Sequence, residues 1–320
     1  MEGMYSPILK CSNETCSNHL SPIKTLFVKK GKGKGLGGKS YQRYQCKVCK
    51  TTFSTRSLNW MGDFRRPELV KEVYALYTSG CSIRRMAIDL KTTKATITNI
   101  IKTLANKCHE YHQNYIDNGF IDTDMVFFDE MESFEQSKAL PVSIGIAVDI
   151  RSKKIIDARV AEIKCKGKLK LNIDKIIDLL PAHYATRKNH SPQMRYEVMK
   201  EIKKCLRDGG TIYTDDKRAY LSLISSVFGG RVLHIHSVSK SIKSHPNPFA
   251  FGRFSSVCAN IRSYMSRMGR RTLITTKKKE MLQAHLWMFI CRYNGYDIDE
   301  ILKQDWFEGK TYERTLKKAS

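Results

Sequence analysis

Acidic residues are scarce in this sequence. Its 320 residues hold 31 Asp and Glu against 56 Lys and Arg, which gives a formal charge of +25 and a pI of about 9.6. Between positions 217 and 279 there is no Asp or Glu at all. A compact chain this positive repels itself and attracts phosphate, so the composition predicts a polyanionic partner.

Long apolar runs are also missing. The strongest one, at 286–291, is far too short to span a bilayer, and no basic-then-apolar signal peptide opens the chain. We therefore expect no membrane association and a cytoplasmic, nucleoid-associated protein. Without a secretion signal, the ten cysteines indicate a reducing compartment, where metal binding is favoured over disulfides. The length suffices for two or three domains.

Four of the cysteines form two close pairs, Cys11 with Cys16 and Cys46 with Cys49. This spacing, with a hairpin-length insert between the pairs, is typical of a four-thiolate Zn²⁺ site in a zinc ribbon, predicted over residues 1–57. Unmetallated thiols, or His19 in place of Cys16, are the alternatives. The insert reads as strands at 25–28 and 41–46 joined by a glycine-rich loop at 31–39. We expect two lysines of that loop, Lys32 and Lys34, to contact DNA phosphates. No Gly-Lys-Ser/Thr opens a helix after a strand, which excludes a nucleotide-binding P-loop.

Helical periodicity begins after Pro67 and continues in three segments, through 77, 82–90 and 97–104. Three helices with a tight turn between the last two predict a helix-turn-helix DNA-binding domain over 58–110, although a small helical bundle shows the same pattern. The start of the third helix would face the major groove with Lys94, Thr96 and Thr98. A connecting helix and turn follow at 106–124.

Two carboxylates end apolar segments that read as strands. Asp129 follows the run 126–128, and Asp215 follows 211–214. Carboxylates at one edge of a sheet hold divalent cations, whereas either residue alone reads as a solvated strand end. Three strands joined by short connections, then helix, strand, helix, strand and helix, predict an α/β fold with a mixed sheet flanked by helices over 111–300. Residues 301–320 form a C-terminal tail.

Four segments resemble motifs of small bacterial insertion-sequence transposases of the DDE type. Residues 128–134 (FDEMESF) with 141–144 are similar to the first catalytic block, 213–220 (YTDDKRAY) to the second, and 262–272 (RSYMSRMGRRT) to the basic helix of the third. The zinc segment 43–49 (RYQCKVC) matches as well. Together with the order of elements, the likeness covers nearly the whole chain, and that family places a zinc ribbon and a helix-turn-helix before a ribonuclease-H-like core.

This resemblance implies an enzyme that cleaves and joins DNA strands by two-metal chemistry, with Mg²⁺ as cofactor and Mn²⁺ as its substitute. It makes Asp129 and Asp215 metal ligands, with Asp216 as the alternative to Asp215. Glu130 would point to the opposite side from Asp129. The implied partners are double-stranded DNA of the element's terminal repeats, target DNA, and further copies of the chain.

The third acid of the family is missing. Alignment on the basic helix puts Ser255 at its position; Glu280 or a histidine such as His234 or His236 could substitute, or a shifted register would select Asn260. The basic helix is expected to contact DNA through Arg262, Arg267, Arg270 and Arg271.

A second function also fits the missing acid. A transposase-derived regulator would keep the zinc ribbon and helix-turn-helix but lack the nuclease. A ribonuclease or Holliday-junction nuclease is less well supported, because it needs no pair of N-terminal DNA-reading modules.

Overall fold

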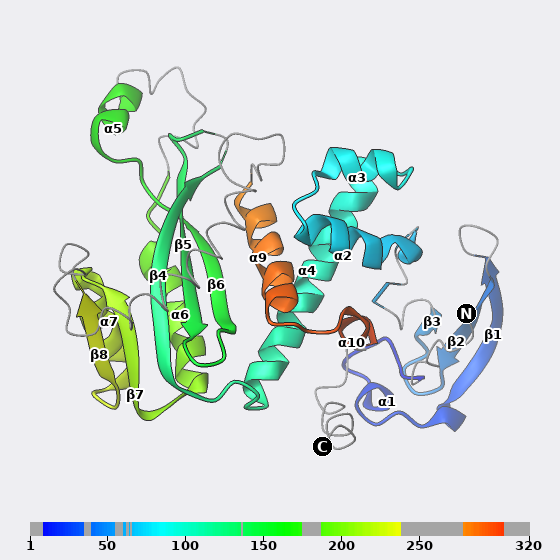
Figure 1. Cartoon of the computed structure of the whole chain (residues 1–320). Helices are drawn as coiled ribbons and strands as arrows, with labels where there is room; N and C mark the ends of the chain where they lie inside the picture. Colours follow the sequence, from blue (N-terminus) through cyan, green and yellow to red (C-terminus); the bar gives the residue numbers. More distant parts are fainter. Residues whose placement is uncertain are drawn as a thin grey trace. The chain divides into compact units, whose positions relative to one another are not determined.

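The computed structural model describes residues 9–34, 40–54, 60–61, 64, 66–135, 137–174, 187–237 and 278–303. The fold divides into two compact units, shown in Figure 1. One combines the N-terminal segment through Glu72 with the segment that begins at Ile298, and the other runs from Val73 to Asp297. Most of the helical segment predicted at 58–110 therefore clusters with the sheet that follows it.

The first unit contains a three-stranded antiparallel sheet next to the cysteine pairs. Its strands are β1 (Phe27–Lys34), β2 (Ser40–Cys46) and β3 (Thr52–Ser54), in that spatial order. Three of the cysteines and Phe53 form a buried cluster in this unit. The remaining described elements here are α1 (Ser17–Leu20), η1 (Lys24–Leu26), η3 (Pro67–Leu69) and α10 (Ile298–Lys303).

The predicted glycine loop is partly wrong, because β1 continues through Lys34. Gly33 lies opposite Tyr41 on β2, and a Cβ at Gly33 would come 2.3 Å from the Tyr41 ring. Glycine therefore permits close packing of an aromatic ring on the neighbouring strand. Residues 35–39 lie outside the described part of the chain.

The second unit is built on a five-stranded mixed sheet with the order β6-β5-β4-β7-β8. β4 pairs antiparallel with β5, and β5 with β6, whereas β4 with β7 and β7 with β8 are parallel. This confirms the predicted α/β class with a mixed sheet flanked by helices. The strands are β4 (Thr123–Phe134), β5 (Pro141–Asp149), β6 (Ile155–Glu162), β7 (Leu206–Asp215) and β8 (Leu233–Ser237).

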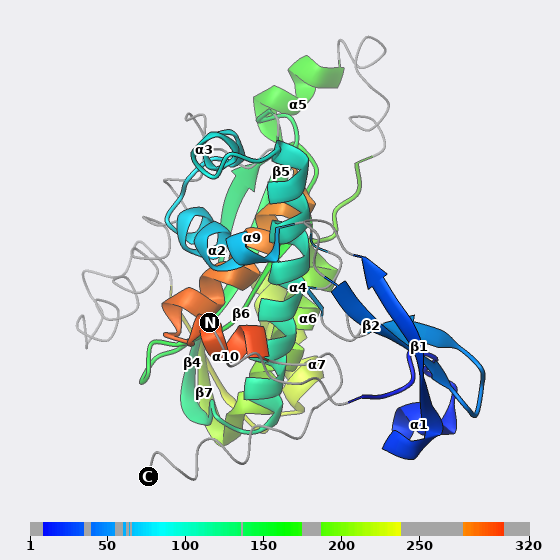
Figure 2. The same ribbon diagram turned by 90° about the vertical axis from the view of Figure 1, so that its right-hand side faces the viewer.

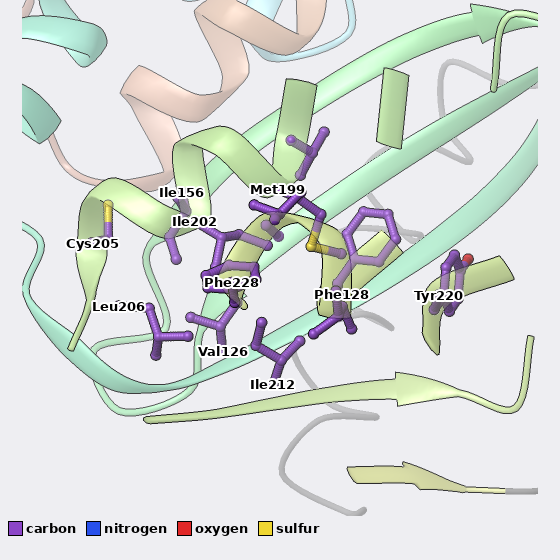
Figure 3. Close-up of a cluster of buried hydrophobic side chains, with 14 of the residues drawn as sticks. Val126, Phe128, Ile156, Met199, Ile202, Cys205, Leu206, Ile212, Tyr220 and Phe228 are labelled. Carbon is purple, nitrogen blue, oxygen red and sulfur yellow. The ribbon is translucent and has the colours of Figure 1, made fainter. Parts of the chain in front are cut away.

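Helices cover both faces of this sheet. On one face α6 (Ser191–Cys205) and α7 (Arg218–Phe228) pack over Val126, Phe128 and Ile212, as Figure 3 shows. On the other face α9 (Lys279–Tyr293) packs its apolar side chains on β5 and β6. Both faces are buried, so β5 is apolar at almost every position rather than alternating.

The outer edge of β6 is closed by two amide side chains of the α9 segment. Gln283 Oε1 accepts from the backbone N–H of Val160, and its Nε2 donates to the carbonyl of Ala158. Asn294 pairs in the same way with both backbone groups of Ile155. An edge strand whose polar groups are satisfied by side chains cannot recruit another strand there.

Three helices precede the sheet: α2 (Val70–Thr78), α3 (Ile83–Asp89) and α4 (Lys94–Asp117). Ser82 and Thr93 cap α3 and α4 by accepting from the backbone N–H three residues later. The prediction of a separate connecting helix after 104 is wrong, because α4 is one continuous helix (Figure 2). Buried residues recur from Ile97 to Ile116, so a single apolar stripe extends through both predicted segments.

Two predicted strand limits also need correction. β4 does not end at Asp129 but remains paired with β5 through Phe134. β7 begins at Leu206 rather than at Thr211, so Gly209 and Gly210, which the sequence alone predicts as the end of a helix, lie within a strand. Apolar spacing alone predicts helices at 173–180 and near 255–268. Of the first the structure describes only the part in α5 (Gly167–Asp174), while 175–186 and 255–268 lie outside the described residues. Among the helices that are described, none has the length and apolarity to cross a membrane.

Candidate metal centres

Asp129 and Asp215 lie on neighbouring parallel strands. The last paired positions of β4 and β7 are Phe127 and Tyr213, and each carboxylate follows two residues later. Side chains two apart on a strand share a face, so both aspartates lie on the same face of the sheet. Paired strands are about 4.8 Å apart, so the two strands are direct neighbours at Phe127 and Tyr213, two residues before the aspartates.

The alternate residues point into the protein. Phe128 and Thr214 are buried, whereas Asp129 is half-buried and Asp215 is exposed. Asp129 Oδ1 accepts from the backbone N–H of Glu130 at 2.8 Å. The pair therefore combines access to solvent with a firmly packed core directly beneath it.

The surroundings of Asp215 are electrostatically mixed. Partial burial raises its pKa, and the negative charges of Glu130 and Asp216 act in the same direction, while the backbone N–H of Lys217 opposes them. A divalent cation at this position would relieve the repulsion between these carboxylates. Asp216, the alternative ligand, is exposed and lies 3.5 Å from His236 Nε2.

Among the described residues, no acid or histidine gathers with this pair as a third ligand. Glu280 is exposed in the first turn of α9. His234 and His236 lie beside Ile212 and Thr214 in the β7–β8 register, on the face opposite to Asp215, and His234 contacts Thr214 Oγ1. Within the described ranges, the one set of three or more potential metal ligands that lie close together is formed by the four cysteines. Ser255 and Asn260 lie outside those ranges.

The four predicted cysteines form that set. The sulfurs of Cys11, Cys16, Cys46 and Cys49 all lie within 4.8 Å of one another. Two of the separations are 3.3 Å, between Cys11 and Cys49, and 3.8 Å, between Cys16 and Cys46. A disulfide requires about 2.05 Å, whereas sulfurs around a tetrahedral Zn²⁺ at about 2.3 Å lie about 3.8 Å apart. The arrangement fits a four-thiolate zinc site.

Hydrogen bonds orient these thiols. The backbone N–H of Asn13 donates to Cys11 Sγ at 3.4 Å, and the buried Asn18 amide donates to Cys46 Sγ at 3.8 Å. Such outer partners stabilise thiolates around a metal. His19 is not part of the set, since its Nδ1 donates to the carbonyl of Cys11 at 2.6 Å.

The proton affinities of the thiols diverge in this cluster. Burial raises the pKa of Cys11 to about 12, whereas hydrogen bonding to Thr51 lowers the pKa of Cys49 to about 6. Four thiolates in one buried site repel one another unless a cation neutralises them. The donor set thus fits a divalent thiophilic ion.

The predicted DNA-contacting residues are placed as follows. Lys94 is exposed at the start of α4, but Thr98 Oγ1 donates to the Lys94 carbonyl and the Thr96 hydroxyl contacts that of Thr93. Lys32 and Lys34 are both exposed on β1. The four arginines of the basic helix lie outside the described residues: Arg262, Arg267, Arg270 and Arg271.

Comparisons with known proteins give limited information. No family model matches the chain, and no curated protein matches it. Among solved structures, the simian T-cell lymphotropic virus intasome in complex with PP2A regulatory subunit B56 gamma is 13% identical, covering 67% of this chain and 71% of that one at a TM-score of 0.21. A pre-cleavage Mos1 transpososome is 10% identical, covering 71% and 79% at a TM-score of 0.19. At these scores the likeness decides neither family nor activity.

One part of the site was missed by the sequence reasoning. The side chain of Glu130 is buried and is contacted by Lys217 and by Tyr220 Oη, which lies 2.6 Å away. Lys217 and Tyr220 belong to the motif that carries Asp215, and Glu130 follows Asp129. Their positions within the two motifs were the available signal, but the contact depends on how β4 and β7 are paired.

Proposed function

We propose that this chain is a DDE-type insertion-sequence transposase with a ribonuclease-H-like core, which cleaves and joins DNA strands at the ends of its element. The observation that carries the proposal is the common face of Asp129 and Asp215 on adjacent parallel strands. The sheet, three antiparallel strands extended by two parallel ones, supports the core that the sequence resemblance implies.

The two aspartates would hold Mg²⁺, or Mn²⁺ as a substitute. When bound, the ions supply Lewis-acid stabilisation of the attacking and leaving oxygens of a phosphodiester. Asp129 and Asp215 orient that site because both project from strands fixed by a buried core on the opposite face. Glu130, packed on that opposite face, stays outside the ligand set.

The other modules supply DNA binding in this proposal. The zinc ribbon presents Lys32 and Lys34, and α4 presents Lys94, while the formal charge of +25 favours phosphate contact over the whole chain. The third ligand would come from the segment around Ser255 or Asn260. The active complex would contain two or more copies, because two element ends are joined together.

The test is strand cleavage and transfer on duplex DNA taken from the flanks of the protein's own gene. With Mg²⁺ or Mn²⁺ present, Asp129→Asn and Asp215→Asn should each reduce cleavage by at least about 100-fold, because each removes a charge that holds the ions. Asp216→Asn is the matched control, as it neutralises an exposed neighbour, and should retain most activity. Cleavage that persists in both variants would overturn the proposed chemistry.

A transposase-derived regulator is the second candidate. It is favoured by the absence of a third acidic ligand beside Asp129 and Asp215 among the described residues. Such a protein would bind the same flanking DNA with wild-type affinity in both aspartate variants and would show no cleavage with either metal. DNA binding and cleavage measured on the same preparations therefore separate the two functions.

A further inference from the structure

The side chain of Glu130 is a buried junction between the two strands that carry the aspartates. It is 6% exposed and forms an ion pair with Lys217, which is 44% exposed. Tyr220 Oη donates to Glu130 Oε2 at 2.6 Å, and Ser143 Oγ donates to Oε1 at 3.0 Å. Arg195 of α6 lies 3.9 Å away. One carboxylate thus collects contacts from β5, α6, and the turn into α7.

These contacts hold the turn that follows Asp215. Lys217 comes two residues after Asp215, and its own backbone N–H donates to the Asp215 carboxylate. Tyr220 lies in the first turn of α7, with its ring 5.2 Å from that of Phe128 beneath the site. Glu130 is the residue after Asp129. The segments on either side of the aspartate pair are therefore bound to each other through Glu130.

We propose that Glu130 and Lys217 form a positioning pair that fixes the turn after Asp215 against β4 and so sets the spacing of the two metal-binding carboxylates. Neither residue contacts the substrate in this role. The inference rests on the proposed function, since it specifies how that site keeps its geometry. Pairing between β4 and β7 ends at Phe127 and Tyr213, so beyond that point side chains must hold the two segments together.

The direction of the effect distinguishes positioning from simple charge. Lys217 is a cation beside a cation site, so on charge alone its removal favours Mn²⁺ binding. If Lys217 instead positions Asp215, its removal weakens Mn²⁺ binding, because the two carboxylates separate. The two explanations therefore predict opposite shifts of one measured quantity.

The same two strands are joined by another ion pair at their far end. Arg207 at the start of β7 contacts Asp122, just before β4, through two hydrogen bonds of 2.8 and 2.6 Å. Arg207→Met is thus a matched control for Lys217→Met. Both changes break a Lys/Arg–carboxylate link between these segments, but only Lys217 lies at the aspartates.

The experiment measures Mn²⁺ binding to the full-length, zinc-loaded protein by the electron paramagnetic resonance signal of free Mn²⁺, with Asp129→Asn defining the site. Lys217→Met should raise the Mn²⁺ dissociation constant about tenfold. Lys217→Arg keeps the cation and should stay within about twofold of wild type, as should Arg207→Met. Thermal unfolding of each variant confirms that it is folded.

Tighter or unchanged Mn²⁺ binding in Lys217→Met, or an equal shift in Arg207→Met, would overturn the positioning role while leaving the proposed function intact. If wild type shows no Mn²⁺ binding that Asp129→Asn removes, the proposed function fails and the positioning role fails with it. Hydrogen exchange across 215–220 provides a second measurement. If Lys217→Met loses protection from hydrogen exchange there but binds Mn²⁺ as tightly as wild type, the contact has only a structural role.

Discussion

Three histidines, two buried and one half-buried, stand out at the scale of single residues. Burial lowers the pKa of His109 and of His112 to about 4, and that of His285 to about 3. His112 Nε2 donates to the carbonyl of Ile156 at 2.7 Å, and the His285 ring packs edge-on against Tyr77. All three rings are therefore neutral in the folded protein at neutral pH.

Folding stability should consequently fall under mildly acidic conditions. An unfolded histidine takes up a proton near pH 6.5, whereas these three do so only near pH 3–4 when folded. As pH falls below 6.5, each contributes a loss of up to about 1.4 kcal/mol per pH unit. Urea denaturation between pH 7 and 5 measures this slope. His285→Phe should reduce this slope by about one proton. The control His190→Gln removes an exposed histidine and should keep a steeper slope than His285→Phe. Equal slopes for His285→Phe and His190→Gln would contradict the account.

Residue types and spacings are enough to predict that the four cysteines form one set, because a metal site requires particular ligands at particular spacings. The two aspartates were predicted from apolar runs that end in acid, and they do share a face. The contact of Glu130 with Lys217 was beyond sequence reasoning, since it depends on strand pairing between segments 87 residues apart.

At the scale of elements, we expect the three-stranded sheet beside the cysteine cluster to depend on a bound metal. The buried cluster next to this sheet consists of three cysteines, Phe53 and a few partly buried neighbours, which is too small to offset the entropy of folding. Chelation, or Cys46→Ser, should make residues 9–54 sensitive to protease while the sheet of the second unit remains protected. Limited proteolysis with mass spectrometry measures this.

Cys165→Ser is the control for the ribbon experiment, because Cys165 lies outside the cluster. It should leave both the zinc content and the cleavage pattern unchanged. A zinc-free protein whose residues 9–54 still resist protease would show that the cysteines pack without metal.

The start of α4 is expected to contact phosphate through Lys94. Lys94→Gln should weaken binding to any duplex and lower the slope of log affinity against log salt by about one, because one counterion fewer is released. Thr98→Val is the control and should keep the wild-type slope, since Thr98 carries no charge and its hydroxyl donates to the Lys94 carbonyl. Fluorescence anisotropy at several salt concentrations measures both, and equal slopes for Lys94→Gln and wild type would exclude this contact.

Element types were more predictable than element limits. Apolar periodicity predicts strands at 142–149 and 154–163 and helices around 220–224 and at 279–293, which agree closely with β5, β6, α7 and α9. It failed for β4, whose mostly polar residues 129–133 remain paired with β5, and for α4, where two helical stripes join without a break. Backbone pairing continues through polar positions, so hydrophobic pattern alone underestimates length.

At the scale of the whole molecule, acidic residues are few, and many of them form ion pairs. Many are engaged by cations inside the fold, among them Asp157 with Arg159, Glu135 with Arg187 and Glu162 with Lys279. Each such pair uses one cation as well as one acid, so the formal surplus of +25 is unchanged while the ratio of remaining cations to remaining acids rises, which favours phosphate binding. The positive net charge could be predicted from the composition alone, because it does not depend on the fold.

The central claim is that Asp129 and Asp215 share a divalent ion. Crystals of the full-length protein bound to flanking DNA and soaked in Mn²⁺, with diffraction recorded at the manganese absorption edge, test it most directly. The account predicts an anomalous peak with an oxygen of each aspartate within about 2.0–2.6 Å. Manganese bound elsewhere, or contacting neither carboxylate, would contradict it.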